Sequence, residues 1–225
     1  MVKLEIAVTT LEDAVRAEKG GANSVELSVD LARDGLTPPI ELMKAVREAV
    51  KIDLHVMVRP HDRDFVYQGE EIDLILAQAK QFAEMGVTGI VFGAHHEDGT
   101  LDVELIKQIA EVAGDCQVTL HRAIDSCSNP EVGLEAVVGA VDRVLTSGPA
   151  ATVWEGRFGL RDWVEKFGNQ FSFVAAGSIK LETIQEIAAF TGVHECHSSS
   201  AARTDGEVDV EKVRGLLHEL ATLGE

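Results

Sequence analysis

Short β-rich apolar runs alternate with amphipathic stretches along the whole chain, and this alternation limits most strongly how the sequence can fold. The runs are Leu4–Val8, Ser24–Val29, Asp53–Val58, Gly89–Gly93, Gln117–Arg122, Asp142–Ser147, Ser172–Gly177 and Val193–Ser198. The segments with helix signals between them include Pro38–Val50, Glu70–Gly86, Leu101–Ala113 and Pro130–Ala140. Strands that alternate with helices form parallel sheets, and eight such units can close into a (β/α)8 TIM barrel. We therefore predict an α/β fold, a single (β/α)8 barrel domain over residues 1–225, with its functional residues at the C-terminal ends of the strands.

The charge balance and the cysteines narrow the class of protein. Asp and Glu total 38 against 20 Lys and Arg, for a net charge of −18. Such a field disfavours nucleic acid and anionic membranes as partners. The chain shows neither a signal peptide nor an apolar run of membrane-spanning length. Its cysteines (Cys116, Cys127 and Cys196) form no C-x-x-C pair, as is typical of a reducing compartment. We expect a cytoplasmic protein whose partner is a small molecule or a metal.

Ionisable residues fall on the strand positions that face the inside of such a barrel. Strand residues alternate between the interior and the helix layer, so apolar Leu4, Ile6 and Val8 turn Glu5 and Ala7 inward. The same reasoning turns further residues inward: Glu26, Ser28, His55, Met57, Arg59, Thr119, His121, Glu195 and His197.

Barrel centres are normally filled with branched apolar side chains, whereas clustered buried ionisable groups are typical of functional sites. Two interpretations stay open. One is an ion-pair network that only stabilises the fold. The other is an acid–base site, for which the candidate catalytic residues are Glu5, Glu26, His55, His121 and His197.

An anion site is predicted at the same end of the barrel. Arg59 opens a polar loop, residues 59–68, of the size that often forms a lid or a binding loop. Short Gly/Ser turns follow the last three strands, where backbone N–H groups often bind phosphate. The candidate ligand-binding residues are Arg59, Arg122, Thr146, Ser147, Gly177, Ser198 and Ser199. The alternative is that these short turns only close the connections.

Metal sites receive less support from the sequence. His95 and His96 are adjacent in a loop and are expected to be exposed to solvent. The neighbouring His194, Cys196 and His197 match no zinc motif. The inward carboxylates and imidazoles can in principle bind a divalent metal through oxygen and nitrogen, but they include no thiolate. No metal ligands are assigned, and the cofactor stays open.

Several strings in order along the chain resemble the CutC family, from Leu4 to about Ala202. They are Leu4–Val8, Gly20–Leu27, Asp34–Pro38, His55–Pro60, Gly89–Gly93, His121–Ala123, Leu145–Gly148 and a last strand that ends at His197. The resemblance implies a (β/α)8 barrel, a cytoplasmic location, a homo-oligomer and an association with copper homeostasis.

The chain departs from the family at the positions that matter for copper. The family usually has cysteine, the proposed Cu(I) ligand, where this chain has Ala7 and Ser28. Soft Cu(I) prefers thiolate and thioether ligands. The turn after the seventh strand also differs, reading Ala176–Gly177–Ser178 where the family tends to have successive glycines. Two hypotheses therefore stand. The first is copper binding by family resemblance, and the second is an enzyme that acts on a small polar or anionic metabolite.

Overall fold

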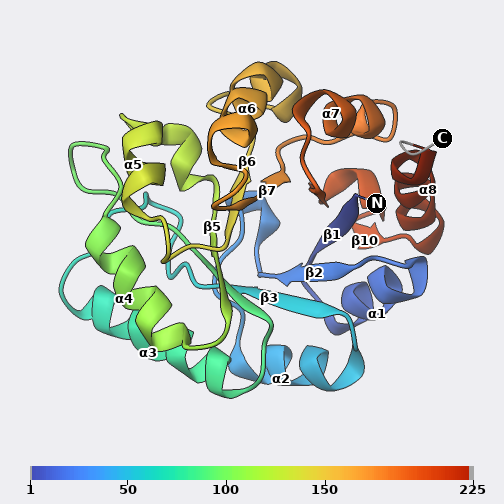
Figure 1. The fold of residues 1–225 in the computed structure, drawn as a ribbon. Coiled ribbons are helices and arrows are strands. Elements are labelled where there is room, and N and C mark those ends of the chain that lie inside the picture. Colours follow the sequence, from blue (N-terminus) through green and yellow to red (C-terminus); the bar gives the residue numbers. More distant parts are fainter. Residues whose placement is uncertain (1, 223–225) are drawn as a thin grey trace.

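The computed structural model describes residues 2–222 as a closed barrel of eight parallel strands in sequence order, with β8 paired to β1 (Figure 1). The strands are β1 (Lys3–Val8), β2 (Ser24–Leu27), β3 (Asp53–Met57), β4 (Gly89–Phe92), β5 (Gln117–Leu120), β6 (Arg143–Thr146), β7 (Ser172–Ala175) and β8 (Glu195–Ser198). The prediction of a (β/α)8 barrel is confirmed. The single-domain prediction over 1–225 stays a prediction, and residues 1 and 223–225 lie outside the described residues.

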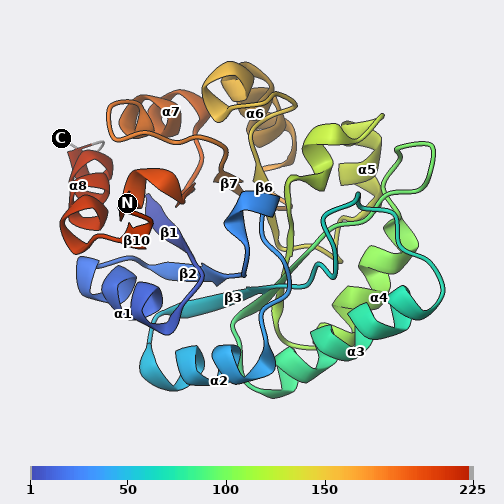
Figure 2. The same ribbon diagram turned by 180° about the vertical axis from the view of Figure 1, so that it is seen from behind.

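Helices surround the strands on all sides, as the two opposite views show (Figures 1 and 2). They are α1 (Leu11–Gly20), α2 (Ile40–Ala49), α3 (Glu70–Glu84), α4 (Val103–Ala113), α5 (Pro130–Ala136), α6 (Val153–Phe167), α7 (Ile184–Thr191) and α8 (Val210–Ala221). Three short 3₁₀ helices lie in the loops that follow strands: η1 (Leu31–Arg33), η2 (Arg122–Ser126) and η3 (Ser200–Ala202). A small hairpin of β9 (Arg203–Thr204) and β10 (Glu207–Val208) precedes α8.

The main apolar core lies between the strands and the helices. Leu4, Ile6 and Val8 of β1 have no exposed surface and belong to this core. Local signals set the helix ends. The Thr10 side chain accepts the Asp13 N–H at the start of α1, and Gly21 ends that helix in the left-handed region, with φ of 96°. On β1 this apolar set therefore fixes which residues face the barrel interior.

Six predicted strands end one or two residues earlier than the apolar pattern suggested, and two of these differences matter for the loops. The second run was expected to continue to Val29, but Val29 pairs with Leu36 inside the loop after β2. The fifth run was expected to reach Arg122, but β5 ends at Leu120 and Arg122 begins η2. Both differences fall where the chain leaves the barrel, so they change what the loops present to the cavity.

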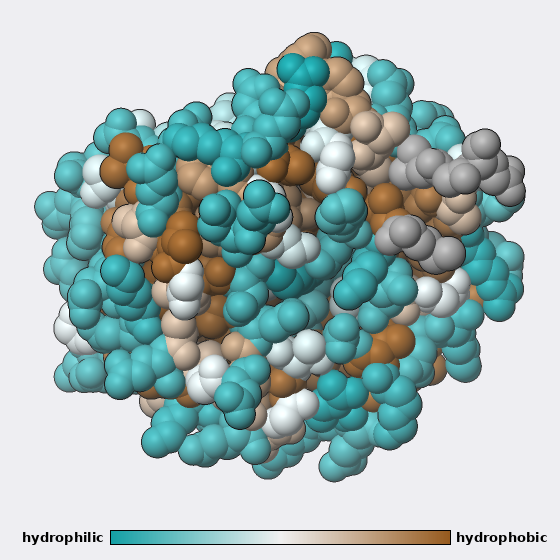
Figure 3. All heavy atoms as spheres, in the orientation of Figure 1, coloured by the Kyte–Doolittle hydropathy of each residue, from teal (hydrophilic) through white to brown (hydrophobic). Residues whose placement is uncertain are grey.

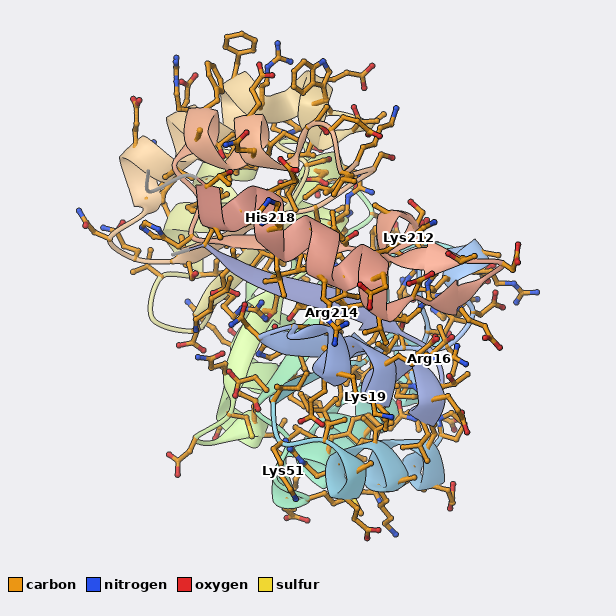
Figure 4. All side chains as sticks on the ribbon, turned by 90° about the vertical axis from the view of Figure 1, so that its right-hand side faces the viewer. Arg16, Lys19, Lys51, Lys212, Arg214 and His218 are labelled. Carbon is orange, nitrogen blue, oxygen red and sulfur yellow. The ribbon has the colours of Figure 1, made fainter. Side chains whose placement is uncertain are left out.

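Hydrophilic side chains cover most of the face drawn in Figure 3. On another side, α1 and α8 lie next to each other and carry basic side chains, among them Arg16 and Arg214 (Figure 4). These two form ion pairs with Glu207 and Glu211, so acidic neighbours offset their charge. No helix within residues 2–222 has the length and hydropathy needed to cross a membrane.

Candidate functional site

A buried guanidinium, Arg143 of β6, occupies the centre of the barrel. It donates to Glu5 over 3.0 Å and to Glu195 over 2.7 Å, and a third bond of 3.0 Å reaches the Thr119 hydroxyl. His55 Nδ1 lies 2.5 Å from the same Glu5 oxygen. We call this group the central layer; its members are Glu5, His55, Thr119, Arg143 and Glu195. Its charged groups satisfy one another, as buried ions must.

Glu5 is held ionised by this surrounding. Burial alone would raise its pKa, but the charges of Arg143 and His55 and a hydrogen bond from His197 keep the pKa well below its usual range. Burial would lower the pKa of Arg143, and the carboxylates of Glu5 and Glu195 raise it instead. The two charges therefore persist at neutral pH.

His197 connects the central layer to the open end of the barrel. Its Nδ1 lies 3.0 Å from Glu5 Oε1, and the strand register sets the two residues side by side on β8 and β1. Burial alone would lower the pKa of His197, but the charge of Glu26 and the bond to Glu5 raise it. His197 therefore favours its charged form more than a free histidine does.

A cavity of about 540 Å³ opens above the central layer, at the C-terminal ends of the strands. Its polar lining includes Glu26, Arg59, His121, Arg122 and His197, and its apolar lining includes Ala7, Met57, Leu145 and Ala176. We call Glu26, Arg59, His121 and His197 the cavity layer. The volume suits a small metabolite.

Glu26 and His121 are buried in the wall of this cavity, and each has polar atoms without a hydrogen-bond partner among the described residues. Glu26 is 5% exposed and has neither a hydrogen bond nor an ion pair among residues 2–222. Burial raises its pKa, and the positive charge of His197 offsets this only in part. His121 is 4% exposed, and burial together with the charge of Arg59 lowers its pKa to about 3. At neutral pH this imidazole is uncharged.

Gly89, which begins β4, and Gly93, which follows it, make room for His55 of β3 and for His121, which follows β5. A Cβ on Gly89 would lie 2.7 Å from the His55 ring, and a Cβ on Gly93 would lie 2.6 Å from the His121 ring. Real Cβ atoms do not approach so closely. The rings of His55 and His121 therefore pack against backbone atoms at these two positions, where any side chain would collide with them.

The loop after β3 covers one side of the cavity. Arg59 is 5% exposed, and its guanidinium donates to the carbonyls of Arg33 and Gly35 over 2.7 and 3.3 Å. The Phe65 ring lies 4.9 Å from that guanidinium and 4.9 Å from the His121 ring. The loop that was expected to form a lid or a binding loop thus supplies Phe65 to the cavity wall.

Arg122 reaches the cavity from η2, with Asp125 as its anchor. Its Nε donates to Asp125 over 2.8 Å, and its Nη2 donates to the Ser147 hydroxyl over 3.0 Å. A Cβ on Gly177 would lie 3.4 Å from the guanidinium carbon, which places Arg122 against the turn after β7. Arg122, Gly177 and Ser199 all line the cavity.

Three predicted ligand-binding residues have other surroundings. The Thr146 and Ser147 hydroxyls donate to Asp125, and neither residue is in the cavity wall that the described residues form. Ser198 is 1% exposed and takes the strand parity that faces the helices, so its side chain turns away from the cavity. Asp125 and strand alternation thus direct these side chains away from the cavity, and ligand binding by these residues stays a prediction.

The exposure of His95 differs from expectation. The next residue, His96, is exposed as predicted, but His95 is only 9% exposed. The Nε2 atom of His95 lies 2.8 Å from the Ala123 carbonyl oxygen. Its ring contacts Phe65 edge-on at 5.6 Å. A loop position therefore did not mean exposure, because the loop packs under η2 and the Phe65 segment.

Sequence reasoning missed Arg143 and Asp125. The sequence of β6 does not show which of its residues face the barrel interior, because the successive residues Val144 and Leu145 are both apolar. The direction of Arg143 could therefore not be predicted from strand alternation. Asp125 lies in η2, outside any strand. The one available signal for Arg143 was the inward excess of carboxylates, which required a buried cation.

One cluster offers ligand atoms at metal-binding spacing. Single atoms of Glu5, Glu26 and His197 lie within 4.8 Å of one another. Two carboxylates and an imidazole suit a hard or borderline divalent ion rather than Cu(I). Arg143 and His197 already supply positive charge to the same carboxylates.

Comparison with known proteins places this chain among described relatives. A sequence model described as the CutC family matches residues 2–202. A protein of Mesorhizobium japonicum named as a family protein CutC is 36% identical over 195 residues, which are 86% of this chain and 76% of that protein. The human copper homeostasis protein cutC homolog is 34% identical over 203 residues, 90% of this chain and 74% of the relative.

Solved structures agree with the fold. The crystal structure of CutC from Streptococcus agalactiae superposes with a TM-score of 0.82 at 25% identity, covering 89% of this chain and 99% of that one. A phosphoribosylanthranilate isomerase from Thermotoga maritima gives a TM-score of 0.64 at 16% identity, covering 99% and 100% of the two chains. The second likeness speaks for the barrel alone.

Proposed function

The chain belongs to the CutC family, and from the cavity at its strand ends we propose that it is an enzyme acting on a small anionic metabolite by acid–base chemistry. One observation carries the proposal. In a chain of net charge −18, Arg59, Arg122 and five further ionisable residues (Glu26, Asp34, His121, Asp125 and His197) line a single cavity of metabolite size. The Glu26 carboxylate and His121 Nε2 have no hydrogen-bond partner among the described residues. Buried ionisable groups without partners are the usual mark of a site that awaits a ligand.

Arg59 and Arg122 would hold the anionic group. Arg59 is buried and held in place by two carbonyls, so little side-chain entropy remains to be lost on binding. Its Nε has no hydrogen-bond partner among the described residues. Guanidinium groups suit carboxylate and phosphate because of their planar donors.

Glu26 and His197 are the residues suited to proton transfer. Burial raises the pKa of Glu26 toward neutrality, which strengthens it as a base. Glu5 holds His197 through Nδ1, which fixes the orientation of the imidazole in the way that a buried carboxylate commonly does for a catalytic histidine. In this proposal Arg143 and Glu5 position His197 and do not contact the metabolite.

The residues present do not fit Cu(I) at the family's cysteine positions. Ala7 offers a methyl group, and Ser28 offers a hard hydroxyl. Met57 is the one sulfur in the cavity wall formed by the described residues. Cys196 is fully buried in the helix-facing core, where burial raises the pKa of its thiol to about 12. We derive no step that involves copper, although relatives carry the name copper homeostasis protein.

A thermal-shift titration with phosphate, sulfate and sugar phosphates tests the anion site. We expect at least one of them to raise the melting temperature. Arg59→Ala should weaken its binding by about 10- to 150-fold, because a hydrogen bond to a charged group contributes about 1.5–3 kcal/mol. Arg16→Ala, which removes a charge on the α1 side (Figure 4), is the matched control and should bind like the wild type. If no anion stabilises the protein, the proposal fails.

Competition against a Cu(I) chelator tests the copper hypothesis separately. The unmodified protein should not compete, whereas the double variant Ala7→Cys, Ser28→Cys should, because it places two thiols on neighbouring strands. Tight Cu(I) binding by the wild type that persists after Cys116, Cys127 and Cys196 are replaced by serine would contradict our assignment.

A further inference from the structure

His121 is fixed as a neutral hydrogen-bond donor. Its Nδ1 accepts the Ala123 N–H at 3.1 Å, so the ring hydrogen of the neutral form must be on Nε2. That Nε2 is buried and has no partner among the residues that the structure describes. Burial and the nearby charge of Arg59 hold the pKa of His121 near 3, so the ring does not gain a second proton at neutral pH. A neutral imidazole of this kind donates a hydrogen bond and is a poor proton shuttle.

Glu26 completes a pair of complementary groups in the same cavity. It is a carboxylate that is 5% exposed, and it faces the cavity without a hydrogen-bond partner among the described residues. Its strand partner in register is His55, whose Nδ1 already bonds to Glu5, so the hydrogen bonds of the central layer do not include Glu26. A poorly solvated carboxylate is a stronger base than one in water.

A carboxylate base and a neutral donor suit one kind of chemistry better than others. When a base removes a proton from a carbon next to a carbonyl, negative charge builds on the carbonyl oxygen, and a neutral donor stabilises that oxygen. Hydrolysis of a phosphate or glycosidic bond would instead need a cation or an acid at the leaving oxygen. An uncharged His121 therefore suits the stabilisation of an enolate oxygen, and it does not itself supply a cation or an acid at a leaving oxygen.

We propose that the metabolite is a small anionic carbonyl compound and that Glu26 removes a proton from the carbon next to its carbonyl, with His121 Nε2–H bonded to the carbonyl oxygen. The C–H electron pair becomes the carbon–carbon double bond of an enolate, the carbonyl π pair moves to oxygen, and the proton goes to the Glu26 carboxylate. Return of the proton, or of a deuteron from the solvent, from Glu26 to the same carbon restores the carbonyl compound without another reactant. This inference rests on the proposed function and names its substrate class.

Nitrogen NMR of the histidines tests the donor directly. The spectrum should show His121 as the Nε2–H tautomer, uncharged from pH 8 to pH 5. A protonated ring at pH 6, or the Nδ1–H tautomer, would overturn the role given to His121. The measurement needs no substrate, so it does not depend on the choice of metabolite.

Hydrogen–deuterium exchange tests the base. The protein is incubated in D₂O with pyruvate, 2-oxobutanoate, dihydroxyacetone phosphate and glyceraldehyde 3-phosphate, and proton NMR follows loss of the signal from the carbon next to the carbonyl. At least one compound should exchange faster than without protein. Glu26→Gln should slow that exchange by about 10²- to 10⁴-fold, and His121→Asn, which keeps an acceptor for the Ala123 N–H, by about 10²- to 10³-fold.

Glu111→Gln is the matched control, since Glu111 is an exposed carboxylate on α4 that lies outside the cavity wall. It should leave exchange unchanged. If none of the four compounds exchanges while anions still raise the melting temperature, the carbonyl inference is wrong and the anion site stands. If no anion binds either, the proposed function itself fails.

Discussion

The central layer and the cavity layer both contain glutamate, histidine and arginine side chains, but they differ in how many of the polar atoms have hydrogen-bond partners. In the central layer Arg143 donates to two carboxylates and a hydroxyl, and the buried charges offset one another. One atom there, His55 Nε2, lacks a partner within residues 2–222. In the cavity layer, Glu26 and His121 Nε2 have no partner within the same range, and Arg59 keeps an unpaired Nε.

From this contrast we expect the central layer to stabilise the fold and the cavity layer to bind the ligand. A satisfied buried network holds its members in one geometry, whereas unsatisfied groups carry a desolvation cost that only a ligand can offset. Substitutions in the central layer should therefore lower the stability, and substitutions in the cavity layer should leave the stability intact while removing binding.

The largest effect is expected for Arg143→Met. It leaves Glu5 and Glu195 as buried carboxylates without their main partner, which should lower the free energy of unfolding by about 3–5 kcal/mol. Urea denaturation at pH 7.5 measures it. Arg16→Met, at the exposed pair with Glu207, should have a far smaller effect. A loss below about 1 kcal/mol for Arg143→Met would mean that the central network contributes little.

A matched pair of carboxylate variants compares the two layers directly. Glu5→Gln removes the charge that bonds Arg143, His55 and His197, and should lower the free energy of unfolding by about 3 kcal/mol. Glu26→Gln removes a buried charge without a partner among the described residues. It should change the stability by less than about 1 kcal/mol or raise it, because burial disfavours the ionised form. Equal losses in the two variants would contradict the division into layers.

A smaller effect is expected in the pH dependence. The pKa of His121 is about 3 in the folded protein, below the ordinary value of 6.5. Between these values the unfolded chain binds a proton that the folded chain does not, so stability falls as the pH falls, by up to about 1.4 kcal/mol per pH unit from this residue. His121→Asn should reduce the slope between pH 6 and pH 4 by about one proton. An unchanged slope would show that His121 is accessible to protons.

Strand parity could be read from the sequence wherever one set of alternating residues is apolar and the other polar. Leu4, Ile6 and Val8 fix the direction of Glu5, and the observed contacts of Glu5 with His55 and His197 agree with it. In β6 both parities include apolar residues, so the pattern gave no direction for Arg143, and the residue at the centre of the barrel was missed.

Contacts outside the strands could not be read in this way. Asp125 takes Thr146 and Ser147 away from the cavity, and η2 buries His95. Each depends on where a loop folds back on the barrel, which neither periodicity nor spacing records. The sequence therefore predicted the barrel and most of its inward side chains, but only part of the cavity wall.

The two glycines at the ends of β4 have a consequence for how such barrels diverge. The rings of His55 and His121 occupy the space that Gly89 and Gly93 leave open. A larger residue at either glycine position would therefore clash with the histidine beside it. Relatives that replace Gly93 with a larger residue should also have lost the imidazole at position 121, and relatives that keep the imidazole should keep the glycine. A family alignment can test this covariation. If it holds, the absence of a side chain at position 93 indicates the histidine at position 121 as clearly as the histidine itself does.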